Sequence, residues 1–464
     1  MRNLKQLCGL ILFWFISCAP PKTLFNNIGS PNLVHKINGL ISESGLNANM
    51  SIKFAAIQSG QTLYALNSQK LLMPASTNKL YTCAAALENL GPDYRFTTSV
   101  LRQNNSLVLR GGGDPDLTVK QLDSLAKIIS TKITLVDTLF IDESLLDSIQ
   151  YGQGWMWDEG AWWYAAPISA LSVNDNCIDF YVNPGSLGEP AKVTIFPQTK
   201  YVKLVNQSIT VKDTANLKKL KIDRDWSGRT NLFTVSGEIL DTVKMDTFYR
   251  NIHDATLFSG SIFSESLKKY GTTVKNIIPS NKSGNLDTLA VHISDSLIVS
   301  AHNMMHKSDN LTAEIFAKTM AVSDTSSGNW RDGLKTIKAF LTNATDMDTS
   351  LLRLSDASGV SRYTLTSADQ IIELLTYMYG SSHKNDFLYT LPSGGSNSTL
   401  KNRFPKSGQN IKAKTGHLSG VSNLSGYIFA DKYGPIAFSI LMNGFIGSPK
   451  PYHNLQEAII QQFF

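Results

Sequence analysis

The segment Ser76-Thr77-Asn78-Lys79 combines a hydroxyl and an amine at the start of a helix that the apolar pattern predicts over 76–90. A spacing of three residues places both side chains on one helix face, where the amine can take the hydroxyl proton and create a nucleophile. The free N–H groups at the helix N-terminus favour the negative charge that develops during attack. The same spacing begins at Ser266 and Ser398, so on its own it indicates an ordinary pair on a helix surface.

The tripeptide Ser308-Asp309-Asn310 lies between two helices predicted over 297–306 and 310–322. Its hydroxyl can pass a proton to a leaving amine, and its amide can hold a substrate backbone together with a lysine ammonium. All three residue types are also good helix N-caps, which is the ordinary role of such a tripeptide. Alone, it leaves a catalytic and a structural interpretation open.

Lys414-Thr415-Gly416 lies on a predicted strand that runs into a hairpin turn at Ser419-Gly420. An ammonium and a hydroxyl together can bind a terminal carboxylate, and a glycine lets a substrate lie against the strand edge as an additional strand. Near-matches at 282–284 and 406–408 lie in loop-like segments. The residue types therefore predict a carboxylate site only in the right structural setting.

The elements that must position these residues come from both ends of the chain. A helix predicted over 30–44 and a hairpin with alternating apolar residues lie at the front, and three strands and a helix lie at the back, over 411–415, 423–430, 436–442 and 454–463. Together they predict one antiparallel sheet flanked by helices, an α/β (α+β) fold formed by 30–92 and 290–464. The strand-like runs between them predict an inserted region over 93–289, with two nested subdomains, the smaller at about 180–250.

In this order and setting, the three motifs resemble the signature of penicillin-binding proteins and serine β-lactamases. The gap of 232 residues between the first two is far longer than in small β-lactamases. It resembles the class C low-molecular-mass penicillin-binding proteins, the S13 peptidase family, which carry domains inserted after the nucleophile helix. Further stretches agree, namely Met73-Pro74-Ala75-Ser76, Gly111-Gly112-Gly113-Asp114-Pro115, Gly154-Trp155-Met156-Trp157-Asp158, Asp356-Ala357-Ser358-Gly359-Val360-Ser361-Arg362 and Ala413-Lys414-Thr415-Gly416.

The resemblance covers residues 30–464 and implies a transpeptidase-like penicillin-binding domain with inserted β-rich domains. It implies a serine D,D-peptidase that acts as a D-Ala-D-Ala carboxypeptidase and is inhibited covalently by penicillins. D,D-endopeptidase activity is a further expectation. By the same resemblance Ser76 is acylated, Lys79 is its base, and Ser308 and Asn310 assist proton transfer and positioning.

The resemblance also assigns the carboxylate site. Lys414 and Thr415 bind the substrate carboxylate beside Gly416, and the backbone N–H groups of Ser76 and His417 form the oxyanion hole. A histidine at 417 departs from the family, which commonly has Thr or Ser there. This leaves the backbone role unaffected, but the side chain can alter substrate fit or the response to pH.

A further substrate contact is expected from the Trp155-Met156-Trp157-Asp158 stretch. In relatives, an acidic residue beside a Trp-x-Trp element helps to form the subsite for the distal ammonium of diaminopimelate. The resemblance therefore implies that Asp158, or Glu159 next to it, binds this ammonium beside Trp155. Without the family, the tryptophans at 155, 157, 162 and 163 either belong to the core or line a groove, and the core is the favoured interpretation.

The first residues indicate export. Met1–Lys5 is basic, residues 7–16 are apolar, and Ser17 precedes Cys18, which together predict a signal peptide over 1–17 and a tether over 18–29. Phe15-Ile16-Ser17-Cys18 resembles a lipoprotein cleavage box, although Phe15 replaces the usual Leu. The prediction is a periplasmic protein of the bacterial envelope, anchored to a membrane through lipid on Cys18.

Composition narrows the remaining possibilities. The 464 residues are 42% hydrophobic and 17% charged, which excludes long disorder and a multi-span membrane protein, and a net charge of +6 is too weak and dispersed for a nucleic-acid partner.

His302 and His306 have a zinc-binding spacing but no third ligand, so neither a metal nor a cofactor is expected. The expected partners are peptidoglycan stems and β-lactams, and the alternatives are a serine β-lactamase and a non-catalytic murein-binding protein.

Overall fold

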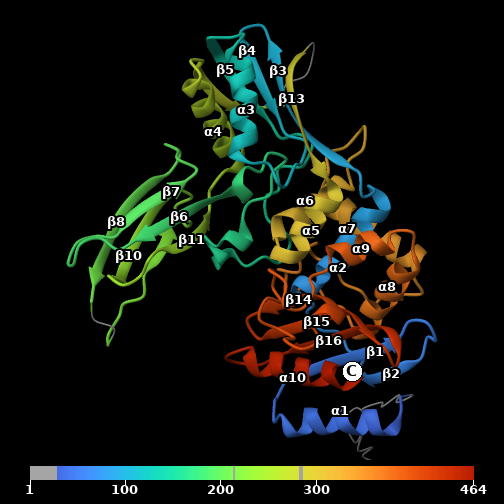
Figure 1. Ribbon diagram of the computed structural model, residues 1–464. Helices are drawn as coiled ribbons and strands as arrows, with labels where there is room; N and C mark the ends of the chain where they lie inside the picture. Colours follow the sequence, from blue (N-terminus) through green and yellow to red (C-terminus); the bar gives the residue numbers. More distant parts are fainter. Residues whose placement is uncertain (1–28, 213–214, 282–285) are drawn as a thin grey trace, which may run out of the picture.

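The computed structural model describes residues 29–212, 215–281 and 286–464, and Figure 1 shows them as a helix-and-sheet body from which two smaller parts extend. The predicted signal peptide over 1–17 and the predicted lipidation site Cys18 lie outside the described residues. Within those residues, no helix combines the length and apolarity that crossing a membrane requires.

The main sheet joins the two ends of the chain, as the sequence predicts. Its strand order is β14-β15-β16-β1-β2, and all neighbours are antiparallel. The central strands β15 and β16 are buried almost throughout, because helices cover both faces of the sheet. The strands are β1 (Asn49–Ala56), β2 (Thr62–Leu66), β14 (Ile411–Leu418), β15 (Val421–Ala430) and β16 (Gly434–Asn443).

One face of this sheet packs against the terminal helices α1 (Pro31–Glu43) and α10 (Lys450–Ile460). Phe54 links the layers, since its ring lies 5.7 Å from that of Phe438 and 4.4 Å from that of Phe463. The other face supports a helical layer made of α2 (Lys79–Asn89), α5 (Leu297–Lys307), α6 (Asn310–Thr319), α7 (Trp330–Ala344), α8 (Ala368–Gly380) and α9 (Lys384–Thr390).

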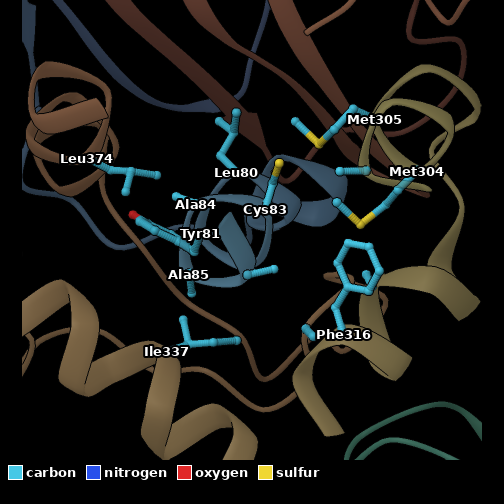
Figure 2. Close-up of a cluster of buried hydrophobic side chains, with 14 of the residues drawn as sticks. Leu80, Tyr81, Cys83, Ala84, Ala85, Met304, Met305, Phe316, Ile337 and Leu374 are labelled. Carbon is cyan, nitrogen blue, oxygen red and sulfur yellow. The ribbon is translucent and has the colours of Figure 1, made fainter. Parts of the chain in front are cut away.

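Helix α2 lies at the centre of this helical layer. The sequence predicts one apolar face, but every residue from Lys79 to Leu87 is buried. Figure 2 shows the side chains around α2, with Met304 from α5, Phe316 from α6, Ile337 from α7 and Leu374 from α8. Because helices pack against α2 on several sides, the residues at its N-terminus are held on a rigid support.

The inserted region begins with a mixed five-stranded sheet of order β12-β5-β4-β3-β13. Helices α3 (Val119–Ser130) and α4 (Ala255–Lys269) pack together beside it and share its hydrophobic core. The sequence interpretation missed both helices, although α3 has a capping box at Thr118 and an amphipathic pattern. The strands are β3 (Arg95–Gln103), β4 (Ser106–Arg110), β5 (Leu135–Asp142), β12 (Thr273–Pro279) and β13 (Asp287–Ser296).

Six strands between α3 and α4 form two small sheets that extend to one side (Figure 1). The first has the order β11-β6-β7 and the second the order β8-β10-β9. This nested part brings residues 224–229 and 253 to the edge of a cavity described below. The strands are β6 (Cys177–Asn183), β7 (Lys192–Phe196), β8 (Lys203–Val211), β9 (Lys221–Arg224), β10 (Leu232–Leu240) and β11 (Asp246–Asn251).

Candidate active site

Ser76 and Lys79 face each other at the junction of two helical segments. Ser76 lies in a 3-10 helix, η1 (Ala75–Asn78), and the α-helix starts only at Lys79, three residues later than predicted. In a 3-10 helix residues i and i+3 are eclipsed, so the pairing that the sequence predicts still forms. Lys79 Nζ lies 3.1 Å from Ser76 Oγ, at hydrogen-bond distance from the expected nucleophile.

Lys79 is fully buried and has two further oxygen partners. Its Nζ donates to Asn310 Oδ1 at 2.6 Å and to the Ser358 carbonyl at 2.9 Å. Burial lowers the pKa of Lys79 to about 8, against the opposing effect of the surrounding carboxylates, led by Asp309. A lysine with this pKa has an appreciable neutral fraction near pH 7 and can accept a proton from Ser76.

The geometry of the Ser308-Asp309-Asn310 tripeptide is compatible with both roles that the sequence leaves open. Ser308 ends α5 in a left-handed conformation (φ 61°), and Asp309 caps α6 by accepting from the backbone N–H groups of Leu311 and Thr312. Asn310, the first residue of α6, contacts Lys79 through Oδ1 and donates to the Tyr164 carbonyl through Nδ2 at 2.8 Å. The structural cap therefore belongs to Asp309, while its two neighbours are free to face the site.

Lys414 brings the third motif to the same place. Its Nζ lies 2.8 Å from Ser308 Oγ and 3.0 Å from the Thr415 carbonyl. Burial, followed by the charge of Lys79, lowers the pKa of Lys414 well below its usual value. A carboxylate that arrives beside this amine would stabilise its charged form, because an opposite charge offsets the cost of burial.

Gly416 has a structural reason that the sequence does not predict. A Cβ atom at this position would lie 2.4 Å from the Pro74 carbonyl oxygen, so the glycine lets β14 pack against η1. Within the part of the chain that the structure describes, the edge of β14 is open beyond Ala413, whose N–H pairs with the Pro392 carbonyl. By the alternation of an antiparallel ladder, the N–H of His417 faces this same edge, as an oxyanion-hole donor must.

A buried loop supports Lys79 from below, and the sequence reasoning assigned it no role. Ser358, whose carbonyl accepts from Lys79, donates its N–H to Glu314 Oε1 at 2.8 Å, and Ala357 N–H donates to Oε2 at 3.0 Å. Asp356 accepts from the N–H groups of Gly359 and Ser361. The sequence signal that could have identified Glu314 is its spacing, because it lies one helical turn after Asn310 on α6 and therefore on the same helix face.

The motif residues open onto a cleft of about 780 Å³. Asp158 and His417 both line it, together with Ser76, Ser308, Asn310 and Thr415. The side chains of Asp158 and His417 are exposed, so both are accessible to a substrate. Glu159 lines the cleft as well, but it accepts a hydrogen bond from the hydroxyl of Tyr164, which leaves Asp158 as the more available acid.

Trp155 does not line this cleft. Its Nε1 donates to Asp356 Oδ2 at 3.1 Å, and its ring lies against a neighbouring cavity, so its direct role is to hold the loop beneath Lys79. For the other tryptophans the favoured core interpretation is wrong, since Trp157, Trp162 and Trp163 are 80%, 46% and 41% exposed. The alternative of groove lining holds for Trp157 in the neighbouring cavity and for Trp163 in the cleft. They lie in short loops and 3-10 turns whose sequence shows no burial period.

The two histidines weighed as metal ligands lie apart from the cleft lining. Their rings, of His302 and His306, stack at 3.8 Å, and the ring of His302 lies 4.9 Å from that of Tyr389. Burial, together with the adjacent His302, lowers the pKa of His306 to about 4. They pack as neutral rings on α5.

Comparison with known proteins agrees with this geometry. The chain is 32% identical over 429 residues to a D-alanyl-D-alanine carboxypeptidase of Actinomadura sp. (strain R39), covering 86% of this chain and 78% of the relative. It is 26% identical to D-alanyl-D-alanine carboxypeptidase DacB of Haemophilus influenzae, covering 96% and 94%. The crystal structure of penicillin-binding protein 4 from Haemophilus influenzae has the same fold, with a TM-score of 0.78, 24% identity and coverage of 92% and 98%. Residues 33–462 match the D-Ala-D-Ala carboxypeptidase 3 (S13) family, and the chain belongs to that family.

Proposed function

We infer that the protein is a serine-type D-Ala-D-Ala carboxypeptidase that cleaves peptidoglycan stems through an acyl-enzyme on Ser76. The observation that carries this is one set of contacts, in which Lys79 reaches both Ser76 and Asn310 while Lys414 reaches Ser308. Residues more than two hundred positions apart thus meet in one cleft in the arrangement that acyl transfer needs. Membership of the S13 family supports the same activity.

In the acylation step, Ser76 Oγ attacks the carbonyl carbon of the penultimate D-Ala and its proton passes to neutral Lys79. The N–H groups of Ser76 and His417 stabilise the oxygen that becomes negative. The C–N bond then breaks, and the leaving D-Ala amine receives a proton through Ser308, which lies between the cleft and Lys414. The product is an ester on Ser76, and water hydrolyses it to restore the serine.

Lys414 and Thr415 bind the terminal carboxylate of the substrate before this step. The open edge of β14 lets the substrate backbone pair as an additional strand, with its carboxylate beside the buried amine. A β-lactam carries a carboxylate and an acyl carbon in a similar relation, so we expect it to form the same ester. A cross-linked stem differs only in its leaving amine, and the same chemistry would then give D,D-endopeptidase activity.

Specificity for the stem side chain is proposed to come from Asp158. Its exposed carboxylate lines the cleft that contains Ser76, and Arg362 lines the same cleft. A side chain with both an ammonium and a carboxylate, such as diaminopimelate, fits a wall that offers both charges.

The proposed location is the periplasm, with Cys18 as the lipid anchor. The support is the sequence alone, which combines a basic start, a short apolar run and Cys18 after Ser17. A protein held in this way would reach peptidoglycan from a membrane surface.

Fluorescent penicillin tests the proposed function. The purified protein should form a stable adduct that mass spectrometry maps to Ser76, and it should release D-Ala from a peptide ending in D-Ala-D-Ala. Ser76→Ala should lose both activities, since loss of such a nucleophile costs several orders of magnitude in rate. Rapid turnover of penicillin without D-Ala release would identify a β-lactamase, and absence of both reactions would leave a murein-binding protein.

A further inference from the structure

A second cavity of about 670 Å³ adjoins the active-site cleft. One wall is the loop that carries Trp157, and the other is the turn from Trp226 to Arg229 in the nested part. Met156 and Glu159 line both this cavity and the cleft, so the two spaces lie on either side of one short segment. Apart from Trp155, which holds the loop beneath Lys79, the residues of this cavity have no part in the acyl-transfer chemistry described above.

The wall from the nested part is a built turn. Asp225 accepts from the Gly228 N–H at 3.1 Å and from the Thr230 hydroxyl at 3.1 Å, and Arg229 N–H donates to the Trp226 carbonyl. Arg229 itself adopts a left-handed conformation with φ 52°. These constraints hold Trp226 and Arg229 on the same side of one tight turn.

The aromatic surface of the cavity is formed by two indole rings in contact, an exposed one from Trp157 and a half-buried one from Trp226. The ring centroids of Trp157 and Trp226 lie 5.2 Å apart, and the ring of Trp157 is 80% exposed. A Cβ atom on Gly160 would lie 3.0 Å from the Trp226 ring, so a glycine is needed for that ring to approach the opposite wall. An exposed indole that rests against a second, half-buried one in this way offers a flat face to a ligand from outside the chain.

The charge of the cavity is positive. Arg224 is buried and donates to Asn251 and Thr230, whereas the exposed side chain of Arg229 has no hydrogen-bond or ion-pair partner among the described residues. The opposing acid, Glu159, is engaged by the hydroxyl of Tyr164. A fixed guanidinium and a free one thus face an aromatic surface, an arrangement that suits a carboxylate on a ligand with a flat face.

We propose that this cavity binds the glycan-side part of the substrate strand, with an N-acetylated sugar against Trp157 and Trp226 and a free stem carboxylate on Arg229. The proposal rests on the proposed function, since a strand whose D-Ala end lies at Ser76 must continue out of the cleft. The segment shared by the two spaces provides that path. Neutral sugar rings stack on indole faces, and a carboxylate of the stem would be the negatively charged partner that the Arg229 side chain lacks among the described residues.

The test compares D-Ala release from two substrates by the full-length protein. One is a disaccharide pentapeptide. The other is a tripeptide that ends in D-Ala-D-Ala and lacks the sugars and the first two stem residues. Arg229→Gln should lower kcat/KM for the disaccharide substrate about tenfold, and leave the tripeptide and the penicillin acylation rate unchanged. Trp226→Leu should show the same selectivity. Arg331→Gln is the matched control, because the side chain of Arg331 is 89% exposed and lies outside the cavity.

Equal losses on both substrates, or no loss on either, would overturn the proposal. A separate measurement keeps it distinct from the proposed function. Calorimetry with a disaccharide dipeptide, which lacks D-Ala, should show binding to the wild-type protein and about tenfold weaker binding to Arg229→Gln. Absence of this binding in an enzyme that cleaves the tripeptide would refute the cavity alone. If the wild-type protein neither cleaves the tripeptide nor is labelled by penicillin, the proposed function itself is refuted.

Discussion

The pH dependence of acylation tests whether Lys79 acts as the base. Its pKa is about 8, because burial opposes the charged amine. Only the neutral amine can accept the proton of Ser76, so the rate should rise as pH increases through this value. The neutral fraction is about 10% at pH 7, about 50% at pH 8 and about 90% at pH 9, from the ordinary titration of a single group. The limiting acylation rate should therefore increase about fivefold from pH 7 to pH 8 and less than about twofold from pH 8 to pH 9.

The measurement is stopped-flow acylation by a fluorescent penicillin at saturating concentration. Saturation matters because the penicillin carboxylate then already occupies Lys414, whose own pKa is lowered by burial and by Lys79. Lys79→Ala should be slow at every pH and lose the rising limb. Tryptophan fluorescence over the same range controls for unfolding. A limiting rate that stays constant or falls between pH 6.5 and 9 in the wild-type protein would refute the assignment of Lys79.

Three further predictions follow from other positions. Gly416→Ala should slow acylation by about tenfold or more and lower the unfolding midpoint, because its Cβ would lie 2.4 Å from the Pro74 carbonyl oxygen; Gly380→Ala, with open space around it, is the control and should change neither. Asp158→Ala should slow cleavage of diaminopimelate-containing peptides about tenfold, the effect of losing one charged contact, without slowing penicillin acylation; equal losses for both would point to misfolding. Cys18→Ala should release the protein from isolated membranes, and a mature N-terminus mapped to another residue would contradict lipidation there.

Much of the fold follows from local patterns in the sequence. Alternating apolar residues define the strands at both ends of the chain, and the apolar pattern after Ser76 defines a helix, because backbone geometry fixes the period of burial within an element. The three motifs are recognisable for a related reason, since each is a short run of reactive side chains whose spacing is set by one helix, turn or strand. Their order along the chain, with the long insertion, indicates the S13 family before any contact is known.

The tertiary structure decided what local patterns cannot express. Lys79 meets Asn310 and Lys414 meets Ser308 only because the helical layer packs on the sheet edge at β14. The same packing explains why Gly416 faces Pro74, a contact that neither segment reveals alone. The exposed Trp157 contacts the half-buried Trp226 from a distant part of the chain, so the interpretation of Trp157 as a core residue failed where the packing left a cavity. The type of a side chain and the period of apolar residues are local properties of the sequence. Which residues a side chain contacts depends on how distant elements pack.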